Sequence, residues 1–79
     1  MFQQMSKHVI KLRPNQVKQF VTEASKCDFD IDIYYNRYMV DAKSILGVFG
    51  LDLTQNLTVN CHGYNAEFEN YIDSLAIAC

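Results

Sequence analysis

The sequence predicts an α/β (α+β) sandwich with the element order βαββαβα, in which an antiparallel or mixed sheet carries helices on one face. Three observations predict this class. Four short segments show the alternation of apolar and polar residues that is typical of half-buried strands. Other segments repeat apolar residues every three or four positions, as one face of a helix does. Two of the strands are separated by only two residues, which indicates a hairpin.

The first strand is expected within residues 5–12, where apolar and basic side chains mix. Arg13 and Pro14 interrupt it, because proline fixes its own φ and biases the preceding residue away from the helical region. Asn15 is then the expected N-cap of a helix over residues 17–26. The apolar positions of this helix lie on one face: Val17, Phe20, Val21 and Ala24.

A hairpin is expected next. Residues 29–35 alternate strictly and contain β-branched and aromatic side chains, and residues 38–40 continue the pattern. Asn36 and Arg37 form the predicted turn, with Arg37 in place of the glycine that a type I′ turn prefers.

The second half of the chain predicts a short helix, a strand and a longer helix. Ser44 is the expected N-cap of the short helix, which Gly47 and Gly50 limit in length. Residues 57–61 alternate and predict the fourth strand. Residues 65–78 predict the last helix, and its apolar face comprises Phe68, Ile72, Leu75 and Cys79.

The composition is that of one globular domain, expected to span residues 1–79. Hydrophobic residues make up 49% and charged residues 20%, which excludes a disordered chain. Seven Lys and Arg residues stand against nine Asp and Glu residues, so the net charge is -2. Because nucleic-acid binding needs a basic surface for the phosphates, we expect no nucleic acid partner.

The three cysteines, Cys27, Cys61 and Cys79, lack the density of a small disulfide-stabilised secreted protein. The N-terminal segment has polar residues where a signal peptide needs apolar ones, and no apolar run approaches the roughly 18 residues of a membrane span. We therefore expect a cytoplasmic protein without membrane insertion.

Metal and thiol chemistry is not expected. The acidic segment 28–32 has the spacing of a calcium loop but lacks the glycine and the glutamate that such a loop needs. No cysteine pair has zinc-ligand spacing. Cys61 and His62 are strand neighbours that point to opposite faces and are poorly placed to share a proton. We expect no metal, no cofactor and no enzymatic activity, with Cys61 in the core.

The short helix carries a more informative pattern. It is too short to bury all of its apolar residues, which are Ile45, Leu46, Val48 and Phe49. One or two of them are therefore expected to face outward, and an exposed apolar cluster on a small protein usually marks a partner surface. The alternative is that the whole run belongs to the core.

The stretch from Val40 to Leu51 resembles the segment around the regulatory serine of HPr, the phosphocarrier of the bacterial sugar phosphotransferase system. The resemblance covers roughly residues 5–77 and includes the end of the first helix and the hairpin. It implies an open-faced sandwich of four strands and three helices, in agreement with the pattern. The matching strings are Lys43-Ser44-Ile45-Leu46-Gly47-Val48, Ala24-Ser25-Lys26 and Tyr35-Asn36.

HPr accepts phosphate from phosphoenolpyruvate, through enzyme I, on a histidine in a His-x-Arg-Pro motif at the start of the first helix. Alignment on Arg13 and Pro14 places Lys11 at the histidine position, and counting back from Ala24 places Arg13 there. Neither side chain offers a neutral nitrogen at physiological pH. His8 lies within the predicted strand. We therefore expect the fold without the carrier reaction.

Ser44 matches the serine that HPr kinase phosphorylates in the family, where the phosphorylated form binds a transcriptional regulator. A helix N-cap suits a phosphate because free amides and the helix dipole favour negative charge. The resemblance implies protein partners: HPr kinase, phosphotransferase-system components or a transcriptional regulator. We expect an HPr-like regulatory or binding protein that lacks the active-site histidine. The alternative is an interaction module without phosphate chemistry that uses Ile45, Leu46 and Phe49.

Overall fold

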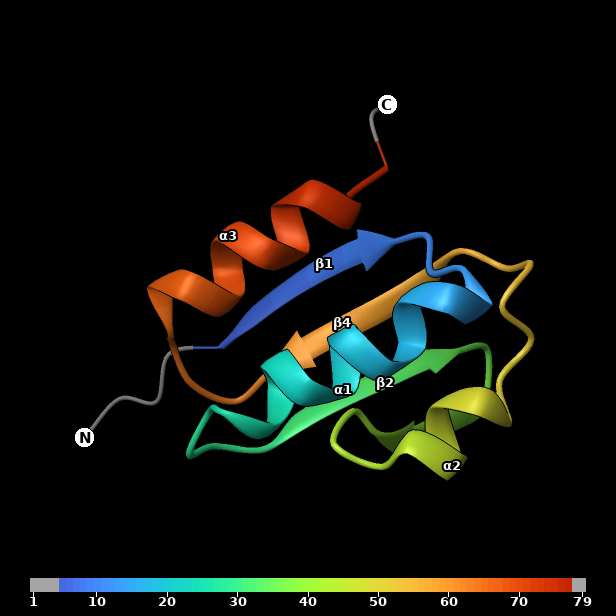
Figure 1. Cartoon of the computed structure of the whole chain (residues 1–79), viewed down its shortest axis with the longest axis horizontal. Coiled ribbons are helices and arrows are strands. Elements are labelled where there is room, and N and C mark those ends of the chain that lie inside the picture. Colours follow the sequence, from blue (N-terminus) through green and yellow to red (C-terminus); the bar gives the residue numbers. More distant parts are fainter. Residues whose placement is uncertain (1–4, 78–79) are drawn as a thin grey trace.

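The computed structural model describes residues 5–77, and their strands and helices follow the predicted order (Figure 1). A short 3₁₀ helix, which the sequence did not predict, directly precedes the first α-helix. The elements are β1 (Ser6–Ile10), η1 (Pro14–Gln16), α1 (Val17–Ser25), β2 (Ile31–Tyr35), β3 (Tyr38–Asp41), α2 (Ile45–Phe49), β4 (Leu57–Cys61) and α3 (Ala66–Leu75).

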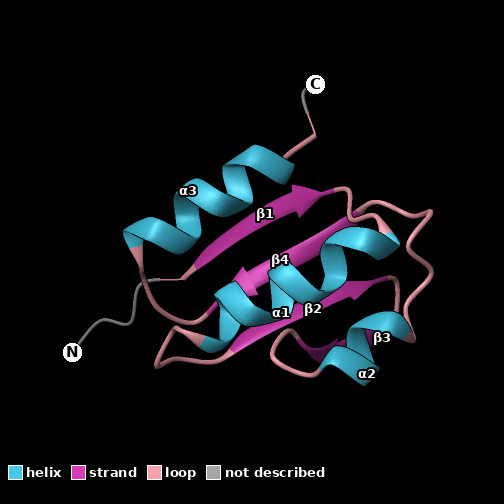
Figure 2. Cartoon of the chain, viewed as in Figure 1, coloured by secondary structure: helices cyan, strands magenta, loops and turns pink. Residues whose placement is uncertain are grey.

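The four strands form one antiparallel sheet in the order β1-β4-β2-β3. All three α-helices lie on the same side of this sheet (Figure 2). Helix α3 runs along β1, α1 crosses in front of the central strands, and α2 lies in front of β3. The predicted open-faced sandwich is confirmed, and the sheet is antiparallel throughout.

The core fills the space between the sheet and the helices. Strands β2 and β4 alternate as predicted, so that every second side chain is fully buried: Ile31, Ile33, Leu57, Val59 and Cys61. Phe20 of α1 and Phe68 of α3 meet above them, with ring centroids 6.2 Å apart. Cys61 is therefore a core residue, as predicted, and is 0% exposed.

The hairpin turn shows why Arg37 is tolerated where a glycine was expected. Asn36 has a φ of 52° and is the one described non-glycine residue with a positive φ. Asparagine adopts this left-handed conformation more readily than most residues. Because Asn36 alone takes the unusual conformation, Arg37 does not need to be a glycine.

The predicted cap at Asn15 is wrong. Asn15 is exposed within η1, and the N-cap of α1 is Gln16. The side chain of Gln16 caps no amide of α1, because its Oε1 accepts a hydrogen bond of 2.9 Å from the Arg13 N–H. The helix thus begins from a 3₁₀ turn instead of a side-chain cap.

Several predicted elements are shorter than expected: α1 ends at Ser25 instead of residue 26, and β2 begins at Ile31 instead of residue 29. Strand β1 ends at Ile10, and the Lys11 N–H then donates to the Leu75 carbonyl. Helix α3 ends at Leu75 because Ala76 is extended and pairs with Ile10. The predicted contribution of Cys79 to the face of α3 lies outside the described residues.

Candidate functional site

Ser44 begins α2 in the conformation of an N-cap, with φ -103° and ψ 109°. Its Oγ accepts a hydrogen bond of 3.2 Å from the Gly47 N–H, which confirms the predicted cap. Ser44 is exposed. The hydroxyl is therefore at the surface, where another protein can reach it.

The loop before Ser44 is fixed by three hydrogen bonds. The Lys43 N–H donates to Oδ1 of Asp41 at 2.9 Å, and the Ser44 N–H donates to the Asp41 carbonyl at 3.0 Å. The Lys43 ammonium donates to the Cys27 carbonyl, also at 2.9 Å. The Lys43 side chain is thereby held near the end of α1. The position of Ser44 is set mainly by the backbone bond between its own N–H and the Asp41 carbonyl.

Helix α2 exposes more apolar surface than predicted. Leu46 is 84% exposed, Phe49 49% and Ile45 41%, while Val48 alone is fully buried. Three of the four apolar residues therefore face outward, where one or two were expected. The reason is that a helix of five residues presents only a narrow stripe to the sheet. The alternative of an entirely buried run is wrong.

Gly47 explains how closely α2 approaches the sheet. A Cβ at this position would lie 3.2 Å from Ser44 Oγ and 3.3 Å from the Cβ of Val40. Both distances are shorter than ordinary van der Waals contact. The glycine therefore allows α2 to pack against β3 while Ser44 keeps its capping position.

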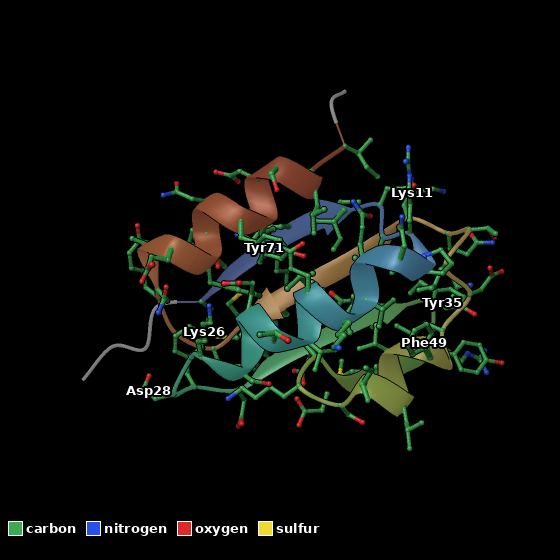
Figure 3. All side chains as sticks on the ribbon, in the orientation of Figure 1. Lys11, Lys26, Asp28, Tyr35, Phe49 and Tyr71 are labelled. Atoms are coloured by element: carbon green, nitrogen blue, oxygen red, sulfur yellow. The ribbon has the colours of Figure 1, made fainter. Side chains whose placement is uncertain are left out.

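Two residues before η1 align with the family's histidine, one in each of the two alignments given above: Lys11 and Arg13. Lys11 and Arg13 are both exposed. The Lys11 ammonium donates a hydrogen bond to the Thr54 carbonyl, which draws its side chain toward the loop before β4. Figure 3 shows Lys11 and Phe49 toward the end of the molecule where α1 begins, Lys11 beside α1 and Phe49 on α2.

His8 lies on β1 and faces α3. Its Nε2 is 2.7 Å from Oε1 of Glu69, and its Nδ1 is 4.0 Å from Oδ1 of Asp73. Ser6 donates a hydrogen bond of 2.9 Å to the other carboxylate oxygen of Glu69. Two carboxylates beside the ring repel an incoming phosphate dianion.

His62 lies on the open side of the sheet. Its Nε2 is 2.8 Å from Oδ2 of Asp32, and it is thereby separated from the buried Cys61 as predicted. The sequence reasoning missed both histidine–carboxylate pairs. The alternation of β2 and β4 placed Asp32 on the open face, but only the strand order brings it beside His62.

The two described cysteines are unsuited to nucleophilic chemistry. Burial raises the pKa of the Cys61 thiol to about 11, and burial also raises the pKa of Cys27. Both thiols are therefore protonated at neutral pH. Within residues 5–77 no group of three or more His, Cys, Asp or Glu side chains is arranged to hold a metal ion, and that part of the chain contains no pocket.

Comparisons with known proteins agree with the architecture. A family model described as the PTS HPr component phosphorylation site matches residues 6–78. The crystal structure of HPr-C-His from Thermoanaerobacter tengcongensis is 27% identical, with a TM-score of 0.67 over 90% of this chain and 92% of that chain. The phosphocarrier protein HPr from Bacillus anthracis str. Ames is 24% identical, with a TM-score of 0.69 over 95% and 99%.

A comparison with curated proteins finds no significant match. Among the described residues, no helix has both the length and the hydrophobicity that crossing a membrane requires.

Proposed function

The chain belongs to the HPr family of the phosphotransferase system, and from this premise we propose that it is a regulatory or binding relative of the phosphocarrier. In this proposal Ser44 is its phosphorylation site, and no histidine carries phosphate. The protein is not itself an enzyme and works in the cytoplasm. Its partners are proteins: HPr kinase, other phosphotransferase-system components or a transcriptional regulator.

The observation that carries the proposal is the exposed Ser44 hydroxyl beside an exposed apolar cluster. A phosphate on Ser44 adds roughly two negative charges at the end of α2. Leu46 and Ile45 lie within the first turn of the same helix. The modification therefore changes the charge of a surface that already has the apolar character of a partner site, without requiring any change in the fold.

The start of α1 supports the second half of the proposal. Residues 11–17 contain no histidine, and the two histidines of the chain are His8 and His62. Both imidazoles lie beside carboxylates, at Glu69 and Asp32. Phosphoryl transfer to a histidine needs a neutral nitrogen in a site that stabilises the negative charge of the phosphate, and neither environment supplies that stabilisation.

Incubation with HPr kinase and ATP tests the regulatory site. Intact mass should rise by one phosphate, and fragmentation should place it on Ser44. The Ser44→Ala variant should gain none. Ser25→Ala is the matched control, because Ser25 is also exposed but its hydroxyl donates to the Val21 carbonyl at 2.7 Å; this variant should be modified as fully as the unaltered protein.

Incubation with enzyme I and phosphoenolpyruvate tests the carrier reaction. The mass of the protein should stay unchanged under conditions that fully phosphorylate an authentic HPr. An acid-labile phosphate that disappears in His8→Ala would instead make this chain a working carrier.

The second candidate function is an interaction module without phosphate chemistry. The exposure of Ile45, Leu46 and Phe49 favours it, since this surface does not depend on a modified serine. Label on another serine, or no label where an authentic HPr is fully modified, would make this candidate the better one.

A further inference from the structure

The two edges of the sheet differ in how they are covered. Strand β1 forms one edge. The segment after α3 returns to it: the Lys11 N–H donates to the Leu75 carbonyl, the Ile77 N–H donates to the Val9 carbonyl, and Ile10 pairs with Ala76. The chain therefore covers much of this edge with its own backbone.

Strand β3 forms the other edge, and no described segment pairs with it there. Tyr35 and Tyr38 flank the two-residue turn, so their backbone groups face each other across the hairpin. In an antiparallel pair the direction of these groups alternates. The N–H and carbonyl of Met39 therefore point outward, and no described backbone group bonds to them.

The exposed side chains at positions 38 and 39 are largely apolar, whereas edge strands usually carry protective features. Lysine, proline and bulges are among these features, and β3 contains none of them; its one charged residue is Asp41, at the end of the strand. Tyr38 is 64% exposed and Met39 58%. An added strand would bury both side chains.

The charge at the end of β3 indicates what kind of strand fits. Asp41 lies directly opposite Asp32 in the register of β2 and β3, and like charges in this position are unfavourable. Asp32 has His62 as a partner at 2.8 Å, whereas Asp41 receives only the Lys43 backbone N–H. A cation opposite Asp41 on a neighbouring strand would compensate the second carboxylate.

We propose that the outer edge of β3 is a docking site for an extended segment of a partner protein, which pairs with β3 as a fifth strand, carries Lys or Arg opposite Asp41 and packs apolar side chains on Tyr38 and Met39. This is strand addition, in which backbone hydrogen bonds supply affinity and alternate side chains supply specificity. The Asp41 carbonyl already accepts from the Ser44 N–H, so the added strand pairs with the outward N–H and carbonyl of Met39.

A phage-displayed library of random ten-residue peptides tests this on the unmodified full chain. The enriched peptides should carry two adjacent apolar residues, one for Tyr38 and one for Met39 on opposite faces of the sheet, and a Lys or Arg two positions beyond the residue opposite Met39. A synthetic copy of the strongest binder is then titrated against variants by fluorescence anisotropy. Met39→Pro removes the outward N–H together with the exposed methionine side chain, and should weaken binding at least about tenfold.

Asp41→Asn is the second variant, because it keeps the Oδ1 acceptor for Lys43 and alters only charge. It should weaken binding about threefold and reduce its salt dependence. If Met39→Pro does not fold, this variant decides the question. Leu46→Ser is the control and should leave affinity unchanged. The proposal is overturned if no peptide is enriched, if the edge variants bind normally, or if binding is lost only in Leu46→Ser.

Discussion

Ahead of α1 the side chain of Gln16 accepts a hydrogen bond from the Arg13 N–H, which lies outside the helix, whereas at the start of α2 the hydroxyl of Ser44 accepts one from the Gly47 N–H within the helix. Around α1 the neighbouring apolar residue, Leu12, is buried. Around α2 the neighbouring apolar residue, Leu46, is exposed. The apolar residue beside one helix start is therefore part of the core, and the apolar residue beside the other is exposed.

The two helix starts differ in role: the start of α1 maintains the fold, and the start of α2 carries the residues of the proposed function. The start of α1 keeps its geometry without a histidine, since a 3₁₀ turn and the buried Leu12 fix it. The start of α2 keeps a modifiable hydroxyl although other residues could also cap the helix. The proposed regulatory site therefore lies at α2, and four stability measurements test the comparison.

The largest expected effect contrasts two identical substitutions. Leu12→Ala should lower the free energy of unfolding by about 2–5 kcal/mol, because Leu12 is 1% exposed and the change leaves a cavity. Leu46→Ala should change it by less than about 0.5 kcal/mol, because Leu46 is 84% exposed. Urea unfolding of both variants measures the difference. Equal losses would show that Leu46 is a packing residue and break the comparison.

The next effect concerns the ionisation of the buried Cys61 thiol in the core. The Cys61 thiol has an ordinary pKa of 9.0, and burial raises it to about 11 in the folded protein. Between these values the unfolded chain ionises first, so the free energy of unfolding should fall as pH rises from 9 to 11, by on the order of 2 kcal/mol. Below pH 9 this contribution is fully present.

Cys61→Ala is the control for the alkaline transition. Urea unfolding across this pH range should show a shallower decline in the variant. Part of the slope should persist, because burial also raises the pKa values of Cys27 and Tyr71. An unchanged slope in Cys61→Ala would assign the whole effect to those two groups.

A smaller effect compares two side-chain caps. Ser44→Ala should destabilise the protein by about 1 kcal/mol through loss of the hydrogen bond to the Gly47 N–H. Asn65→Ala removes the equivalent bond of α3, which is 3.0 Å long from the Phe68 N–H, and should cost a similar amount. Thermal unfolding followed by circular dichroism measures both. A neutral Ser44→Ala would mean that the family match, and not capping, explains the serine.

The smallest effect concerns the start of α1. Arg13→Ala should change the free energy of unfolding by less than about 0.5 kcal/mol, because the side chain is exposed and the contact with Gln16 uses the Arg13 backbone. Gln16→Ala is the companion variant and should cost more, since it removes the acceptor of that N–H. A large loss in Arg13→Ala would reveal a structural role at the position that matches the family histidine.

Much of the site could be predicted because its signals are local. Ser44 precedes an apolar run, and a serine in that place caps a helix through an amide three residues on. Asn15 does not cap α1, because it lies within the 3₁₀ turn η1, where the Gln16 side chain bonds to the Arg13 N–H. The number of exposed residues on α2 could not be predicted, since it depends on how Gly47 and Val40 set the distance to the sheet.

The sequence by itself determined the order of the elements, the hairpin and the capping role of Ser44, because each depends on residues close together in the chain. Tertiary structure decided that His8 faces Glu69, that Asp32 meets His62, and that the segment after α3 covers the β1 edge of the sheet. These contacts depend on strand order, register and helix placement. Local periodicity predicts which face a side chain occupies, but the partner it meets there is set by long-range packing.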